Sequence, residues 1–194
     1  MDFITASRDI EQQIIADRRF LHQHAEVGFD LPETRAYVIS RLKELGYAPK
    51  EMGQGIVAQL GEGSPCILLR ADMDALPIQE DHPDAPYCSK TAGVMHACGH
   101  DCHISMLLTA ALMLNDIKDE LAGTVVCAFQ PAEEIGKGAC SMIEEGALDG
   151  VDAAFGMHVW SDIPSGKISV REGATMASGD RFEVNIEGKG GHGA

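Results

Sequence analysis

Basic residues are scarce in this chain: 15 Lys and Arg stand against 30 Asp and Glu, a formal net charge of -15 over 194 residues. A surface of this sign repels phosphate groups, so we expect no nucleic acid and no anionic membrane as a partner. No segment approaches the ~20 apolar residues that a membrane span requires. The first residues, MDFITASRDIEQQ, also lack the basic start and apolar stretch of a signal peptide. We therefore expect a globular cytoplasmic protein.

Paired cysteine spacings are missing as well. The 6 cysteines are spread from Cys66 to Cys140 without a CxxC pair, so we expect thiols rather than a disulfide framework. The Cys-x-His spacing of Cys98 and His100 is too short for a zinc finger. A redox role for Cys98 and Cys102 is a weaker hypothesis, because their spacing is not that of redox pairs.

Helical and strand patterns alternate along the chain. The helical patterns begin with a helix whose N-cap is Ser7, and they continue at 31–47, 102–114 and 138–146. Short aliphatic runs predict strands at 56–60, 66–71, 124–129, 151–156, 167–172 and 181–187. The runs at 66 and 124 are apolar on both faces, as in a parallel sheet covered by helices. This order predicts an α/β fold with a mostly parallel sheet flanked by helices.

Residues able to bind metal follow the ends of these strands. The stretch VMHACGHDCHISMLL, residues 94–108, opens a predicted helix, and ADMDALP, QPAEE and MHV each follow a strand directly. In an open α/β sheet these ends meet at one edge, where ligands bind. The candidates at that edge are Asp72, Asp74, Cys98, His100, Glu133, Glu134 and His158.

A mixed set of sulfur, nitrogen and oxygen ligands suits Zn²⁺, Mn²⁺ or Co²⁺, and a site with carboxylates usually keeps a position open for water. Of the neighbours Glu133 and Glu134, one can bind a metal while the other takes a proton from water. Taken singly, the pair could be solvated surface, His158 a core residue and the DMD stretch an Asx-turn. Their coincidence at one edge favours a hydrolytic site.

Several ordered motifs resemble one enzyme family. They are HQHAEVGF, RADMDALPI, GVMHACGHDCH, QPAEEIGKGA, FGMHVW and EGKGGHGA. The chain resembles the metal-dependent amidohydrolases of the hippurate hydrolase, aminoacylase and auxin-conjugate hydrolase type, within the co-catalytic metallopeptidase family that includes glutamate carboxypeptidase. The resemblance implies a metallo-exopeptidase-like catalytic domain and two divalent ions, Zn, Mn, Co or Ni, in the complete site.

The resemblance also implies roles for individual residues. Cys98 matches the bridging ligand, Glu133 the general base, and Asp74 the carboxylate that orients the site. The further metal ligands implied are His100, Glu134 and His158. Asp72 stands where other branches carry a metal-binding histidine, and its role is left open. We expect Asp101 to act as a helix cap or a partner of the ligands, and His96 and His103 not to bind metal.

The chain departs from the family at two places. Ala25 replaces a usual proline, which alters only a turn. Family members are also about twice as long, with an inserted α+β lid or dimerisation domain and one more metal-binding histidine in the C-terminal half. We therefore expect residues 1–178 to be the N-terminal part of the catalytic domain and 179–194 the start of the lid. His192 matches a lid histidine that polarises the scissile carbonyl in a neighbouring subunit.

The activity implied is hydrolysis of the amide bond of an N-acyl or N-aroyl amino acid, releasing a carboxylic acid and the free amino acid. The family also implies a homodimer or homotetramer for the full-length form, with weak or no activity for this chain alone. Two alternatives stay open. One is cleavage of dipeptides or aminobenzoyl-glutamate, and the other is a non-catalytic metal-binding module, against which the Glu133 and Glu134 pair speaks.

Overall fold

A computed structural model describes residues 2–179 and 182–193 of the chain. The chain divides into two compact units, Met1–Val159 and Trp160–Ala194. The first unit contains all the helices and strands given below. The predicted domain boundary after residue 178 stays a prediction. Among the described residues, no helix combines the length and the apolar character needed to cross a bilayer.

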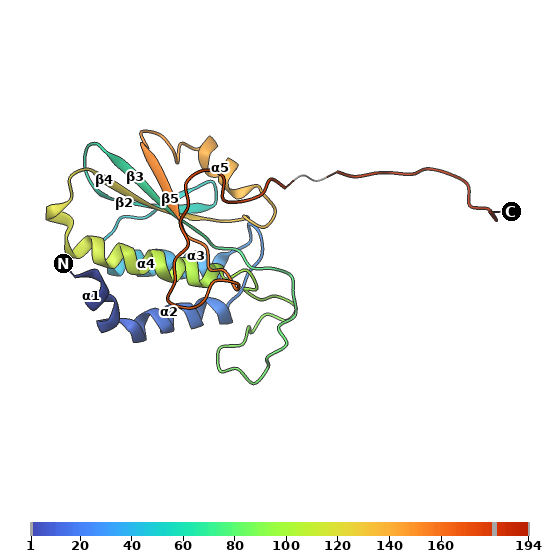
Figure 1. Cartoon of the computed structure of the whole chain (residues 1–194), viewed down its shortest axis with the longest axis horizontal. Helices are drawn as coiled ribbons and strands as arrows, with labels where there is room; N and C mark the ends of the chain where they lie inside the picture. Colours follow the sequence, from blue (N-terminus) through green and yellow to red (C-terminus); the bar gives the residue numbers. More distant parts are fainter. Residues whose placement is uncertain (1, 180–181, 194) are drawn as a thin grey trace. The chain divides into compact units, whose positions relative to one another are not determined.

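A five-stranded sheet forms the centre of the first unit (Figure 1). Its strands are β1 (Lys50–Met52), β2 (Gly55–Gly61), β3 (Cys66–Asp72), β4 (Thr124–Gln130) and β5 (Ala153–Gly156). Their order is β1-β2-β4-β3-β5. Strands β3, β4 and β5 are parallel, whereas β2 pairs antiparallel with both β1 and β4. The sheet is therefore mixed, and its parallel part carries the predicted site motifs.

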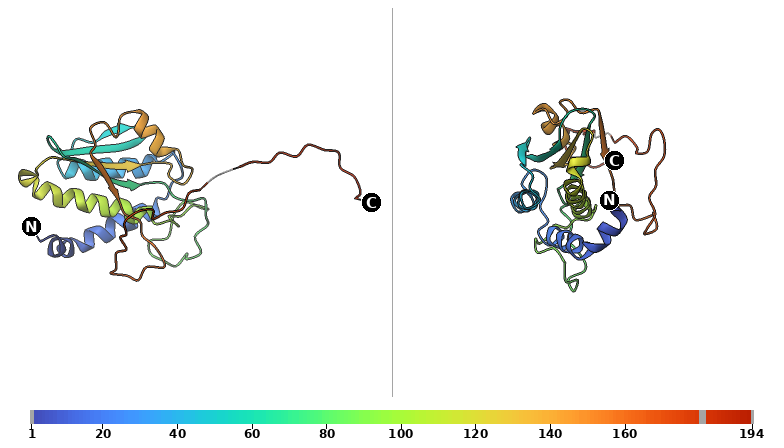
Figure 2. Two further views of the ribbon diagram at one scale, coloured as in Figure 1. Left: turned by 45° about the horizontal axis from the view of Figure 1, so that its top comes forward. Right: turned by 90° about the vertical axis from the view of Figure 1, so that its left-hand side faces the viewer.

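Helices cover both faces of the sheet. They are α1 (Phe3–Asp9), α2 (Glu11–Gln23), α3 (Pro32–Glu44), α4 (His100–Asp116) and α5 (Gly138–Glu144), with a short 3-10 helix, η1, at Lys118–Glu120. Helices α3 and α4 contact the sheet, and α2 packs on α4. Figures 1 and 2 show α5 on the opposite face. The predicted α/β fold with flanking helices is confirmed.

The main core lies between the sheet and α3 and α4. Phe129 of β4 and Ile56 of β2 are fully buried there. The opposing helices contribute Val38, Leu42, Ile104 and Leu108. Burying each such side chain contributes about 1.5–3 kcal/mol, so this layer fixes α4 on the sheet and with it the start of α4.

The N-terminal helix begins earlier than predicted. Asp2, not Ser7, is the N-cap of α1, because its carboxylate accepts a hydrogen bond from the amide of Ile4. Ser7 lies inside α1, where its hydroxyl donates to the carbonyl of Ile4. The predicted single helix is divided at Ile10 into α1 and α2.

Two predicted strands are absent from the described residues. Residues 167–172 and 182–187 belong to no strand, and residue 181 lies outside the described residues. The alternating side chains of these segments, such as Ile168, Val170 and Val184, are exposed. A strand needs a hydrogen-bonding neighbour, and none pairs with either segment in the described part of the chain. Conversely, the short edge strand β1 was not predicted.

Candidate metal centre

The candidate residues come from the carboxyl ends of the three parallel strands and from the start of α4. Asp72 ends β3, and Asp74 follows it. The turn after β4 carries Glu133 and Glu134, and the segment after β5 carries His158. The remaining candidates, Cys98 and His100, stand at the N-terminus of α4. The fold thus brings six of these seven residues into groups whose donor atoms lie within 4.8 Å of one another, and Asp74 supports them.

His100 is the common member of these groups. It is fully buried, and its Nδ1 donates to the carbonyl oxygen of Asp74 at 2.7 Å. A carbonyl only accepts, so Nδ1 carries the hydrogen, and Nε2 is the nitrogen left to bind a cation. Nε2 lies 3.6, 3.8 and 3.7 Å from carboxylate oxygens of Asp72, Glu133 and Glu134, respectively.

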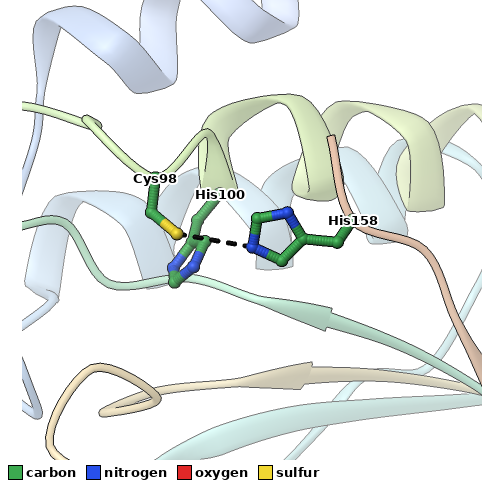
Figure 3. Close-up of side chains that lie close together, drawn as sticks. All are labelled: Cys98, His100 and His158. Atoms are coloured by element: carbon green, nitrogen blue, oxygen red, sulfur yellow. Dashed lines mark hydrogen bonds between the residues drawn. The ribbon is translucent and has the colours of Figure 1, made fainter. Parts of the chain in front are cut away.

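Cys98 and His158 face each other beside His100 (Figure 3). The thiol Sγ of Cys98 lies 3.4 Å from Nε2 of His158. The other ring nitrogen of His158, Nδ1, contacts the carbonyl oxygen of Val159 and therefore carries the hydrogen. Each histidine thus keeps Nε2 as its metal-binding nitrogen, as metal-binding histidines do when a carbonyl fixes the ring, and one donor atom each of Cys98, His100 and His158 lie within 4.8 Å of one another.

Gly99 makes the turn between Cys98 and His100 possible. It is the N-cap of α4 and has a φ of 90°, in the left-handed region that favours glycine. A Cβ atom at this position would stand 2.4 Å from Cγ2 of Val159. Glycine therefore serves both the backbone conformation and the close approach of the segment that carries His158.

Asp74 holds the turn that carries the two glutamates. Its Oδ1 accepts a hydrogen bond from the amide of Glu133 at 2.9 Å, and its Oδ2 accepts one from the amide of Glu134 at 3.2 Å. The side chain of Glu133 is 40 % exposed and that of Glu134 is 20 % exposed. One carboxylate is thus open to solvent, while the other is directed inward.

The carboxylate of Asp72 interacts with three side chains, those of His103, Arg70 and His100. Its Oδ1 accepts from Nδ1 of His103 at 2.6 Å, and its Oδ2 pairs with Arg70 at 2.6 Å. Burial raises the pKa of Asp72, but the hydrogen bond from His103 and the charges of His100 and Arg70 lower it more, to about 2. Nε2 of His103 accepts from the amide of Val159 at 2.9 Å, so both ring nitrogens of His103 are already used.

The electrostatics of the centre favour a cation. Burial, together with the charges of Glu134 and Glu133, raises the pKa of the Cys98 thiol to about 12. Burial lowers the pKa of His100, but its carboxylate neighbours raise it overall. A cation bound at this point would lower both pKa values. Its charge stabilises the Cys98 thiolate, and it takes the place of a proton on Nε2 of His100 between that nitrogen and the carboxylates.

The donor set fits divalent metal ions. Nε2 of His100 and Oε1 of Glu134 are buried and have no hydrogen-bond partner among the described residues. Such atoms are costly to bury unless a ligand satisfies them. The sulfur, imidazole and carboxylate donors are those of Zn²⁺, Mn²⁺, Co²⁺ or Ni²⁺ sites. Among the described residues, Cys98, His100, Glu134 and His158 would hold the ions.

Some residues lie apart from this centre or were missed. His192 belongs to the second unit, and its predicted role stays a prediction. His96 is buried with neither ring nitrogen hydrogen bonded to a described residue. The sequence alone indicates no role for Arg70 or His22; the motif HQHAEVGF contains His22 but does not reveal its distant partners.

A mixed sheet with helices on both faces, and with cysteine, histidine and carboxylate donors at its carboxyl edge, defines the catalytic-domain class of the metal-dependent hydrolases. Residues 68–193 match the family described as Peptidase family M20/M25/M40. The chain belongs to this family.

Similar proteins agree with this assignment. The chain is 48% identical over 189 residues to N-acetyl-L-cysteine deacetylase of Bacillus subtilis, covering 95% of this chain and 45% of that protein. It is 44% identical over 189 residues to IAA-amino acid hydrolase ILR1-like 5 of Arabidopsis thaliana, covering 96% and 43%. The crystal structure of Bacillus subtilis YXEP, described as a dinuclear metal binding peptidase from the M20 family, has a TM-score of 0.77 and 42% identity, covering 81% and 45%. The chain therefore spans about half the length of these relatives.

Proposed function

We propose that this protein hydrolyses the amide bond of N-acyl or N-aroyl amino acids, releasing a carboxylic acid and the free amino acid. The observation that carries the proposal is the buried Nε2 of His100, which faces three carboxylates without a hydrogen-bond partner among the described residues. Relatives described as a deacetylase of an N-acetyl amino acid and a hydrolase of an amino-acid conjugate support this substrate class.

The proposed site uses two divalent ions, with Cys98 as the bridging ligand and His100, Glu134 and His158 as further ligands. When bound, the ions supply Lewis acidity: they make water more acidic and stabilise the negative charge that develops on the amide oxygen. The description of the similar YXEP structure as a dinuclear metal binding peptidase supports two ions. We propose Zn, Mn, Co or Ni.

Glu133 is the proposed general base. Its carboxylate, the more exposed of the two, would take a proton from the attacking water and later deliver it to the leaving nitrogen, while the less exposed Glu134 would bind metal. Asp74 would orient both residues through their amides. His192 would polarise the scissile carbonyl from a neighbouring subunit of a homodimer or homotetramer. The cytoplasmic location expected from the sequence stays a prediction.

A matched pair of substitutions tests the roles of the two glutamates. Metal content per chain is measured by elemental mass spectrometry after loading with Mn²⁺ or Zn²⁺ and desalting. Glu133→Gln is expected to keep the wild-type metal content, and Glu134→Gln to lose metal. In a full-length form, Glu133→Gln is expected to abolish hydrolysis; loss of metal from this variant would instead make Glu133 a ligand.

A substrate panel separates the proposed reaction from its alternatives. N-acetyl and N-benzoyl amino acids, dipeptides and aminobenzoyl-glutamate are compared in a full-length form, with preferential cleavage of the acyl amino acids expected. Bound metal without hydrolysis of any of these substrates would favour the non-catalytic metal-binding module. We expect the 194-residue chain alone to turn over at well under the ~1 per second typical of enzymes.

A further inference from the structure

A long loop connects the two halves of the candidate centre. Residues 77–94, here called the 77–94 loop, contain no helix or strand and join the segment of Asp74 to that of Cys98. The ends of the loop are closed by a pair of backbone hydrogen bonds between Leu76 and Met95. Figures 1 and 2 show the loop in green, beyond the C-terminal end of α2. Its two ends therefore lie beside each other, next to the segments that carry Asp74 and Cys98.

The loop is fastened to the last turns of α2 by its backbone. The side-chain amide of Gln23 donates to the carbonyl of Pro86 at 3.0 Å, and the amide of Lys90 donates to the carbonyl of Gln23 at 2.9 Å. These bonds hold two places in the loop, Pro86 and Lys90, against one residue of the helix.

Tyr87 adds an aromatic contact at the same place. The guanidinium carbons of Arg18 and Arg19 lie 4.9 and 5.3 Å from the centre of its ring. The ring of His22 meets it edge-on at 5.8 Å. Cations over an aromatic ring are attracted to its face, so the loop is held by more than its hydrogen bonds.

His22 joins the loop to the residue that follows His100. Its Nε2 lies 3.2 Å from Oε1 of Glu80 in the loop, and its Nδ1 lies 2.7 Å from Oδ2 of Asp101 in α4. Ionised carboxylates accept and do not donate, so both ring nitrogens of His22 carry hydrogens. Nη2 of Arg18, 3.2 Å from Nδ1, is then a second cation beside the ring and not a donor to it. All three side chains are buried, and they come from segments far apart in the sequence.

The cluster is balanced in charge and leaves each carboxylate with a second donor. Arg18 approaches the same oxygen of Asp101 at 2.8 Å, and the amide of Ser89 donates to Oε2 of Glu80 at 2.7 Å. Two cations, Arg18 and His22, thus face two anions. Removing one member of such a buried cluster is expected to destabilise the fold, because it leaves an uncompensated charge.

We propose that His22 is a positioning residue: by bridging Glu80 and Asp101, it fastens the 77–94 loop as a fixed wall to the turn that carries Cys98 and His100. The loop is then not a free lid, and the geometry of the metal ligands depends on a helix that contributes no ligand. The effect on the metal centre rests on the proposed function, whereas the effect on the loop does not.

Hydrogen exchange of the metal-free chain tests the fastening of the loop. In His22→Gln, one amide group replaces a ring that bridges two carboxylates, so amides of residues 80–90 are expected to exchange about tenfold faster or more. The matched control is His82→Gln, because His82 is exposed on the same loop. Wild-type exchange in a folded His22→Gln variant would overturn the proposal.

Glu80→Gln provides a second route if His22→Gln does not fold. It keeps the size of the side chain and one accepting oxygen, removes the charge, and turns an NH₂ group toward either Nε2 of His22 or the amide of Ser89. Faster exchange of the loop amides is again expected. A folded Glu80→Gln chain with the exchange pattern of wild type would count against the bridge that His22 forms between Glu80 and Asp101, here called the clasp.

Cobalt tests the link to the metal ligands. Co²⁺ bound to the Cys98 thiolate and to histidine nitrogens has an absorption spectrum that depends on ligand geometry. His22→Gln is expected to change this spectrum and to weaken Co²⁺ binding about 10–100-fold, while His82→Gln matches wild type. An unchanged spectrum and affinity would overturn the positioning role. Failure of the wild-type chain to bind Co²⁺ would count against the proposed metal centre, and the clasp is then judged by exchange alone.

Discussion

The carbonyl oxygen of Asp74 accepts a hydrogen bond from Nδ1 of His100 at 2.7 Å. The carboxylate of the same residue accepts the amides of Glu133 and Glu134. One residue after β3 therefore sets both the ring orientation of a candidate ligand and the turn after β4. The backbone carbonyl and the carboxylate of Asp74 thus make different contacts. A substitution of this residue can remove the contacts of the carboxylate while leaving that of the carbonyl.

Asp74→Asn is expected to weaken metal binding about 10–100-fold and to reduce the free energy of unfolding by about 1–3 kcal/mol. An asparagine side chain can accept one of the two amides through its oxygen, but its NH₂ group faces the other amide as a second donor. Titration with Mn²⁺ or Zn²⁺ measures the first effect, and urea denaturation measures the second.

Asp152→Asn is the control for Asp74→Asn. Oδ2 of Asp152, the residue before β5, also accepts a backbone amide, that of Cys66 at 2.7 Å, but this contact is at the start of β3, at the opposite end of the strands from the candidate ligands. This variant is expected to lose some stability and to keep wild-type metal affinity. Equal losses of affinity in both variants would mean that Asp74 has no special part in the centre.

Gly99→Ala is expected to destabilise the start of α4. Alanine at a φ of 90° costs about 1–2 kcal/mol, and its Cβ would stand 2.4 Å from Cγ2 of Val159. Because the clash pushes against the segment that carries His158, metal affinity is also expected to fall. Thermal unfolding and metal titration measure the two effects.

Gly93→Ala separates strain from collision. Gly93 has a φ of 74°, and a Cβ there would meet nothing within 4 Å, so this variant has only the conformational cost. The double variant Gly99→Ala/Val159→Ala is expected to recover part of the lost affinity. If Gly93→Ala lowers metal affinity as much as Gly99→Ala does, the collision with Val159 is not the cause.

Much of the fold could be predicted because its signals are local. The aliphatic runs of β3 and β4 and the apolar stripe of α4 are properties of neighbouring residues. The predictions failed where pairing decides. The alternation in 182–187 needs a partner strand, which the described residues do not supply, and the antiparallel direction of β2 is set by the strand that it joins.

The sequence predicts which residues supply the metal donors, but not the contacts that hold them in place. The residue types at strand ends indicate where metal donors gather, because parallel strands share one carboxyl edge. The supporting contacts join residues separated by long stretches of chain: His22 to Asp101, Asp72 to His103, and Asp74 to Glu133. No spacing rule reveals such pairs, since they arise only when the helices and strands pack.

His96→Met is expected to leave metal content unchanged and to keep or slightly raise stability, by up to about 1 kcal/mol. His96 is buried, and burial lowers its pKa to about 4, so it is neutral at pH 7. Its ring nitrogens have no hydrogen-bond partner among the described residues, and methionine of similar size removes that cost. Elemental mass spectrometry and urea denaturation test this, with His100→Met as the variant that should lose metal. Loss of metal from His96→Met would instead make His96 a ligand.

The clasp around His22 predicts a pH dependence of stability. The hydrogen bonds to Asp101 and Glu80 and the charge of Asp101 raise the pKa of His22 above its usual 6.5, against the effects of burial and of the charge of Arg18. Burial raises the pKa values of Asp101 and Glu80, but their partners lower them overall, so both stay ionised above about pH 5. The other groups near the ring are Tyr87 and the neutral His96.

A group with a raised pKa in the folded state stabilises the fold fully below its unfolded pKa, and loses that contribution as pH rises through the folded value. The difference in unfolding free energy between wild type and His22→Gln is therefore expected to be largest from about pH 5 to 6.5, and to shrink at higher pH. Urea denaturation from pH 5 to 9 measures it, with His82→Gln following the wild-type profile. A difference that stays constant over this range would mean that the charge of His22 does not hold the loop, because a neutral ring would then serve Glu80 and Asp101 equally well.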